Sequence, residues 1–177
     1  SYVLAVPSVH GDGSIVLTIT RFAVTPDCNP RFNEQTGGLK GGDEQVVSIS
    51  RDVGKTWSVP QRLPIPDDLR TGINAPVFER SGGQWMQVLE RWKTWDDVAP
   101  LHIRGYAIFS SDQGKTWSRP MDLPWVTDTT RMHSHAQYQE LPDGRIAGTH
   151  WTQTLGGQTN LGLGLAFASK DGRQWTD

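Results

Sequence analysis

Two histidines, His133 and His135, have a spacing that could support chemistry. Residues two apart in a strand point to the same side, so the two imidazoles would share one face of a sheet. Such a pair could act as a base and its orienting partner, or as two metal ligands. No third ligand is evident, so we expect neither a metal nor another cofactor. The alternative interpretation is that both histidines line a polar channel.

A second cluster combines aromatic and charged side chains. Trp92 and Trp95 lie beside Lys93, Asp96 and Asp97. Aromatic faces with hydrogen-bonding neighbours suit sugar rings, so Trp92 and Trp95 are candidates for substrate binding. Trp92 could equally be an apolar plug between sheets.

Glu90 and Arg91 precede this cluster on the same expected strand. Because side chains alternate along a strand, one of the two should face a channel or a neighbouring sheet. We take Arg91 as a further candidate for substrate binding.

A repeated motif indicates the elements that position these side chains. The octapeptide SxDxGxTW occurs at residues 50–57 and 110–117, and a one-residue-shorter form occurs at 169–175. A turn motif that recurs at such a period predicts one structural unit used three times. Its aspartate can accept backbone N–H bonds within the turn and its glycine permits positive φ, so we interpret the motif as a structural hairpin. The structural positions are Asp52, Trp57, Asp112, Trp117, Asp171 and Trp175.

The chain is expected to be all-β. Its many glycines and prolines favour short strands joined by turns. Each unit should form a four-stranded antiparallel meander, with units at about 1–65, 66–125 and 126–177. The third unit should lack a full fourth strand. The expected strands cover 3–9, 15–21, 45–50 and 58–63, then 75–79, 85–92 and 103–110, then 136–141, 145–152 and 161–169.

Alternate turns of a meander lie at opposite ends of its sheet. The octapeptide turns therefore mark one end, and the long segment 22–44 belongs at the other. Long ordered loops often carry function, and disorder is the alternative.

The octapeptides SRDVGKTW and SSDQGKTW resemble the Asp-box, or BNR, repeat of the sialidase (neuraminidase) superfamily. The resemblance covers nearly the whole chain and implies a β-propeller of four-stranded antiparallel blades. Catalytic domains of the family have six blades, and this chain has material for about three. It would therefore be a fragment, or two copies would form a homodimer that completes a six-bladed ring.

The resemblance also implies site residues. Family members follow a GDGxLL segment with an Arg and then with the Asp that acts as general acid and base. Here residues 11–16 read GDGSIV, and Arg21 and Asp27 follow, with Asp43 as a substitute for Asp27. The alternative is that Asp27 is a solvated loop carboxylate. The tyrosine nucleophile, its glutamate partner and two further arginines would come from later blades.

A departure from the family concerns the substrate. Members begin this blade with Arg-Ile-Pro, whose Arg binds the carboxylate of sialic acid, whereas this chain has Ala5 at the matching position. The stretch from Arg131 to His135 resembles a family segment near the central channel, which makes Arg131 and both histidines candidates for substrate binding. The expected function is a sialidase-like exo-glycosidase acting on a carbohydrate. The alternatives are a non-catalytic module that binds glycan or protein, and a His-dependent polysaccharide lyase.

Composition excludes some partners. The chain has 177 residues and a net charge of −2, which gives no electrostatic footprint for nucleic acid. No apolar run is long enough to span a bilayer, so we expect no membrane partner. The single cysteine, Cys28, cannot form an intramolecular disulfide. The compartment is undetermined, and secretion after removal of a signal peptide is compatible with the sequence.

Overall fold

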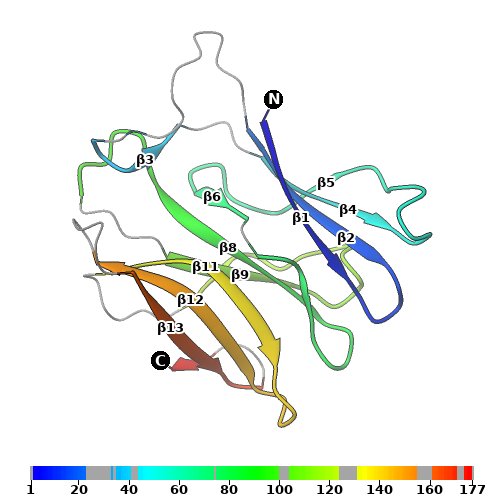
Figure 1. Ribbon diagram of the computed structural model, residues 1–177. Helices are drawn as coiled ribbons and strands as arrows, with labels where there is room; N and C mark the ends of the chain where they lie inside the picture. The colour runs from blue at the N-terminus through cyan, green and yellow to red at the C-terminus, as the bar shows by residue number, and fades with distance from the viewer. Residues whose placement is uncertain are drawn as a thin grey trace.

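The computed structural model describes residues 2–22, 33, 35–40, 44–73, 75–99, 104–123, 131–154, 161–170 and 174–176. Within these ranges the fold is all-β, which confirms the expected class. The strands form three sheets that lie one after another along the chain (Figure 1). The described residues contain no helix with the length and hydrophobicity to cross a membrane.

The first and third sheets are four-stranded antiparallel meanders. The first has the order β1-β2-β4-β5, and the third has the order β11-β12-β13-β14. The first contains β1 (Tyr2–Val9), β2 (Ile15–Phe22), β4 (Glu44–Ser50) and β5 (Gln61–Arg62), and the third contains β11 (Arg131–Glu140), β12 (Ile146–Thr154), β13 (Leu161–Ala168) and β14 (Trp175–Thr176).

The second sheet is built around its longest strand, β8 (Trp85–Thr94). One neighbour of β8 is β9 (Arg104–Ser110), followed by β10 (Met121–Asp122). Two short strands, β6 (Arg70–Gly72) and β7 (Phe78–Glu79), take the place of the single expected strand 75–79. Pro76 lies between them and has no N–H to donate to a ladder. The parallel strand β3 (Gly38–Leu39) joins the end of β8 from the long segment 22–44.

The final strands are short in every sheet. β5, β10 and β14 have two residues each. The third unit was expected to lack a full fourth strand, and among the described residues the short outer strand is common to all three sheets.

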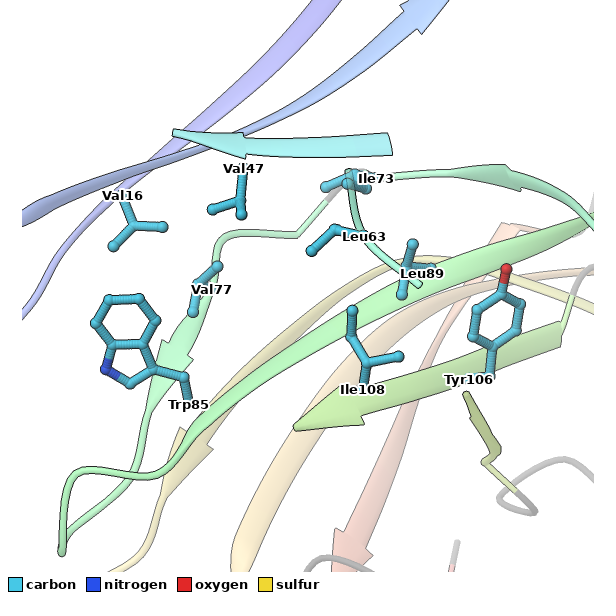
Figure 2. Close-up of a cluster of buried hydrophobic side chains, with 9 residues drawn as sticks. All are labelled: Val16, Val47, Leu63, Ile73, Val77, Trp85, Leu89, Tyr106 and Ile108. Carbon is cyan, nitrogen blue, oxygen red and sulfur yellow. The ribbon is translucent and has the colours of Figure 1, made fainter. Parts of the chain in front are cut away.

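The core lies between the sheets. The first and second sheets enclose Trp85, which is fully buried, together with aliphatic side chains of both sheets (Figure 2). A second cluster between the second and third sheets includes Met86, Val88 and Ile146. Because burying each large apolar side chain contributes about 1.5–3 kcal/mol, these two layers hold the three sheets together.

The two full octapeptide turns have the same hydrogen bonds. In the first, Asp52 Oδ1 accepts the Thr56 N–H at 2.8 Å and Asp52 Oδ2 accepts the Thr56 hydroxyl at 2.6 Å. Asp112 and Thr116 repeat both distances. These bonds lower the pKa of Asp52, and they lower the pKa of Asp112 to about 2. Both carboxylates are thus occupied by the turn and are poorly suited to proton transfer.

The two motif tryptophans differ in their surroundings. Trp117 packs against the cluster between the first two sheets, 6.5 Å from the ring of Trp85. Trp57 is 42% exposed, so among the described residues it is less buried than a core side chain between two sheets. Asp171 lies outside the described residues. Trp175 is placed in β14 by its backbone.

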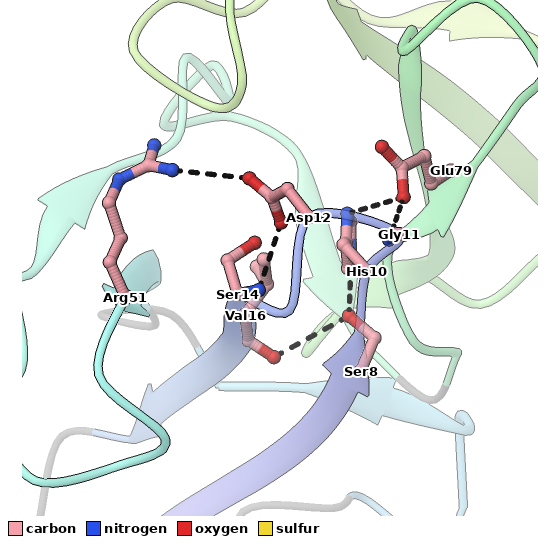
Figure 3. A network of polar contacts seen from close by, with 8 residues as sticks. All are labelled: Ser8, His10, Gly11, Asp12, Ser14, Val16, Arg51 and Glu79. Carbon is pink, nitrogen blue, oxygen red and sulfur yellow. Dashed lines mark hydrogen bonds and ion pairs between the residues drawn. The ribbon is translucent and has the colours of Figure 1, made fainter.

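A polar network ties the first sheet to the second at the end that carries the octapeptide turns (Figure 3). Glu79 accepts the N–H of Gly11 at 2.6 Å, and its carboxylate lies 3.7 Å from His10 Nδ1. His10 Nε2 lies 3.0 Å from the Ser8 hydroxyl, and the His10 ring stands edge-on to Trp85. Burial lowers the pKa of His10, opposed by Glu79 and then Asp12. The histidine is therefore a neutral, structural contact.

Candidate functional site

The sheet ends opposite the octapeptide turns carry most of the candidate residues. Arg21 ends the ladder of the first sheet, where its register partner is Glu44. Arg21 Nη1 lies 3.1 Å from Glu44 Oε2, with both side chains substantially exposed. An exposed ion pair contributes only about 0–1 kcal/mol, so the guanidinium can be shared with a ligand.

This pairing places both ends of the long segment at one end of the first sheet. β2 ends at Phe22, and β4 begins at Glu44, the register partner of Arg21. Asp27 and Asp43 belong to this segment by sequence, and both lie outside the described residues. The geometry around Asp27 is accordingly left as a prediction.

The loop is attached to the second sheet through the predicted aromatic cluster. The Trp95 carbonyl accepts hydrogen bonds from Asn33 at 3.0 Å and from the Thr36 hydroxyl at 2.8 Å. Lys40 Nζ lies 4.9 Å from the centre of the Trp95 ring. Trp95 is half-buried beneath this segment, which limits the ring face available for sugar stacking.

Lys93 has a different position from the one expected. It was grouped with the aromatic and charged cluster suited to sugar binding, yet it is 5% exposed. Its ammonium group donates to the carbonyl of Thr36 at 2.6 Å and to that of Ala99. Lys93 therefore anchors the loop on β8 and is not available to a ligand.

Glu90 and Arg91 point in opposite directions, as strand alternation requires. Glu90 is 5% exposed and accepts the backbone N–H of His135 in the third sheet. Arg91 is exposed and lines a hollow between the second sheet and the connection that precedes it. The structure therefore does not bring Arg91 and His135 into one pocket.

The bond to Glu90 coincides with an irregularity in β11. The ladder register shifts between Ser134 and Gln137, and His135 has a φ of 54°. This bulge interrupts the alternation on which the shared face of the two histidines depended. His135 is exposed, lies 5.2 Å from the ring of Trp151, and its Nδ1 is 3.2 Å from the Ser134 hydroxyl.

Three further candidates lie in β11 and β8. The backbones of Arg131 and His133 lie in β11, opposite Thr154 and Thr152. Trp92 is half-buried in β8, opposite Arg70. Among the described residues, no group of three His, Cys, Asp or Glu side chains could hold a metal ion.

A polar hollow of about 410 Å³ adds residues that the sequence interpretation missed. It lies between Glu44 on β4, Arg62 on β5 and Arg70 on β6. Asp67 pairs with Arg62, and its carbonyl accepts Arg70 Nη1 at 2.7 Å. The Nε of Arg70 is buried without a hydrogen-bond partner. Arg70 had no distinguishing sequence signal, because its place beside Glu44 depends on how two sheets pack.

Buried polar side chains support the floor of this hollow. Gln45 Oε1 accepts the Thr20 hydroxyl at 2.6 Å, and Gln45 Nε2 donates to the Thr71 carbonyl at 3.0 Å. Buried networks of this kind hold their members in one arrangement. The hollow is thus held between β4 and β5 of the first sheet and β6 of the second.

Comparison with known proteins identifies the fold. Neither a family model nor a curated protein matches the chain. Similar solved structures include a protein of unknown function from Dyadobacter fermentans (22% identity, TM-score 0.70), the Hadza microbial sialidase Hz136 (18%, 0.64) and the family 117 glycoside hydrolase Zg3597 of Zobellia galactanivorans (15%, 0.62).

The matches cover 97%, 97% and 92% of this chain, but only 48%, 32% and 50% of the three solved chains. The chain thus spans half or less of their length. At these identities the likeness establishes the fold alone: the chain has a sialidase-like β-propeller fold, similar to that of the sialidase and the family 117 glycoside hydrolase named above.

Proposed function

We propose that the chain is part of a sialidase-like glycoside hydrolase that removes terminal sugars from a glycan. The observation that carries the proposal is the attachment of the segment 22–43. Its two ends meet at the Arg21–Glu44 pair, and its middle is bound to β8 through Lys93 and Trp95. A loop anchored on two sheets can present a catalytic side chain in a defined place.

In this proposal Asp27 is the general acid and base. It protonates the glycosidic oxygen as the bond to the leaving group breaks, and it then removes a proton from the water that completes hydrolysis. Asp43 is the alternative for this role. Arg21 binds an oxygen-rich or anionic group of the substrate, since its ion pair with Glu44 is exposed.

The substrate is a glycan whose recognition does not depend on an arginine at the start of the first sheet. Ala5 lies exposed in β1, opposite Ile19, and its methyl group cannot bind a carboxylate. This feature argues against sialic acid as the preferred sugar. It is also the observation that favours the second candidate, a non-catalytic propeller module that binds glycans.

A panel of fluorogenic glycosides would test the proposal, with sialosides beside neutral and uronic acid glycosides. We expect release of the fluorophore from at least one glycoside. Asp27→Asn should reduce kcat by a factor of 10² or more, because proton transfer contributes about 10²–10⁴-fold. An exposed acid at the opposite end, Asp12→Asn, is the matched control. Binding without hydrolysis by folded protein would favour the second candidate.

We also propose that the three sheets are three blades and that a second copy supplies the rest of the ring. Trp151, Leu163 and Leu165 are 55%, 69% and 54% exposed on one face of the third sheet. The first sheet exposes Pro7 and Val9. A twofold dimer would place the first sheet of each copy against the third sheet of the other copy. The ring would then close through two equivalent contacts.

A further inference from the structure

A second hollow lies between the second sheet and the connection that leads to it from the first sheet. It has a volume of about 580 Å³, which is within the range of ligand pockets. One wall is apolar and stiff, formed by Pro64, Ile65, Pro66 and Leu69 of the connection between the sheets and by Pro120. The other wall is polar and comes from the second sheet.

The polar wall contains a buried hydroxyl that makes no hydrogen bond of normal geometry. Tyr106 is 1% exposed, and its hydroxyl has no partner of normal geometry in the described chain, although Thr71 is near. Tyr106 lies near the start of β9 and is labelled in Figure 2. Leaving a buried hydroxyl unpaired costs about 1–3 kcal/mol. Such a group in the wall of a hollow is ready to bond to a ligand.

Two cations line the same hollow. Arg91 and Arg119 are exposed, and among the described residues neither guanidinium group makes an ion pair or hydrogen bond. Asp122 is the one carboxylate among the lining residues. Guanidinium groups bind carboxylates and sulfates through paired N–H donors.

We propose that this hollow binds an oxyanion carried on a saccharide, with Arg91 and Arg119 on the carboxylate or sulfate and the sugar ring against the proline wall. The Tyr106 hydroxyl donates to the same oxyanion. This site would hold an acidic glycan at a distance from the reacting bond. Binding at this site involves no hydrolysis, so the proposal can be tested independently of the role of Asp27.

Isothermal titration of the intact chain would test the site with three tetrasaccharides. The probes are a glucuronate-containing tetrasaccharide, a sulfated galactan tetrasaccharide and neutral cellotetraose, with sodium sulfate as a fourth. We expect at least one acidic tetrasaccharide to bind tenfold or more tightly than cellotetraose. The two acidic probes distinguish carboxylate from sulfate as the anion.

Four variants then locate the binding. Arg119→Gln should weaken it about tenfold, whereas Arg51→Gln, which removes the same charge at the opposite end, should not. Tyr106→Phe should weaken binding severalfold while leaving the melting temperature unchanged or raised, because the lost hydroxyl had no partner. A purely structural tyrosine would show the reverse pattern. Asp27→Asn should bind as the wild type does.

The proposal is overturned if the acidic and neutral tetrasaccharides bind equally, or if Arg119→Gln binds like Arg51→Gln. It is also overturned if sulfate alone binds as tightly as the acidic tetrasaccharides, since the site would then recognise an adventitious ion only.

Discussion

The indole of Trp85 lies against Gly114 so closely that a β-carbon on this glycine would stand 2.7 Å from Trp85 Cζ3. Gly114 belongs to the second octapeptide, and Trp85 is the fully buried residue that begins β8. The corresponding glycine of the first octapeptide, Gly54, has nearly the same φ, 84° against 82°. Its nearest side-chain atom, Ile15 Cδ1, would be 3.8 Å from an added β-carbon.

These two glycines predict unequal effects of alanine. Gly54→Ala should lower the free energy of unfolding by about 1–2 kcal/mol, the cost of a left-handed residue with a side chain. Gly114→Ala should lower the free energy of unfolding by about 1–3 kcal/mol more, because the added methyl group would overpack against Trp85. Urea unfolding of the two variants measures the difference. Equal losses would mean that Trp85 moves freely and that the contact is unimportant.

A pH dependence is predicted for His10. Burial lowers its pKa in the folded state, so the unfolded chain binds more protons as the pH falls below about 6.5. The stability that neutral His10 provides should therefore be complete above this pH and should decrease below it, until the pH passes the pKa of the folded state. One proton limits the slope to about 1.4 kcal/mol per pH unit.

The measurement is chemical unfolding between pH 5 and 7.5, compared with His10→Gln. Glutamine does not titrate, so this variant should have a flatter profile over that range. If the wild type and His10→Gln lose stability in parallel, another group is responsible and the assignment to His10 is wrong.

The sequence predicted the strands that have local signals. The expected ranges 15–21, 45–50 and 85–92 lie within one or two residues of β2, β4 and β8, because runs of apolar residues bounded by turn residues determine them. The contacts that cross between units had no such signal. β3 is two residues long and depends on β8, and the partner of Glu90 is a backbone N–H of the third sheet.

The residues of the candidate site likewise divide into those with a local sequence signal and those whose role depends on packing. Arg21 was a candidate because the family resemblance implies an Arg after the GDGxLL segment, and the structure places it at the end of the β2–β4 ladder. Arg70 and Tyr106 were missed, since their importance lies in a buried atom without a partner, which no spacing reveals. Lys93 was misread because a lysine in a polar run resembles a solvated one, although here backbone carbonyls surround it.

Lys93 is predicted to control the stability of the loop attachment. Lys93→Met leaves the carbonyls of Thr36 and Ala99 without their donor, at a cost of about 1–3 kcal/mol for each group that stays buried. The amides of Gly37 and Gly38, which bond within the attached segment, should exchange with solvent at least tenfold faster. Hydrogen exchange measured by NMR reports this directly.

The control for this prediction is Lys40→Met. Lys40 makes a cation–π contact with Trp95, worth about 0.5–1 kcal/mol, and does not bond to the loop carbonyls. Its effect on exchange should be small. Equal acceleration in both variants would show that positive charge, and not the position of Lys93, holds the segment.

The exposed face of the third sheet gives the last prediction. Trp151 and Leu163 are ladder partners on this face. The neighbouring pair, His150 and Gly164, belongs to the opposite face, where His150 is buried. A β-carbon added to Gly164 would lie 2.1 Å from the imidazole of His150. Sedimentation velocity should detect a dimer of about twice 19.7 kDa, and Leu163→Asp with Leu165→Asp should convert it to a monomer with unchanged far-UV circular dichroism. The matched control, Val53→Asp, changes an apolar side chain that is 81% exposed in the first octapeptide turn and should leave the dimer intact. A wild-type monomer at 100 μM would rule out ring closure by a second copy, and the apolar face would then require a different partner.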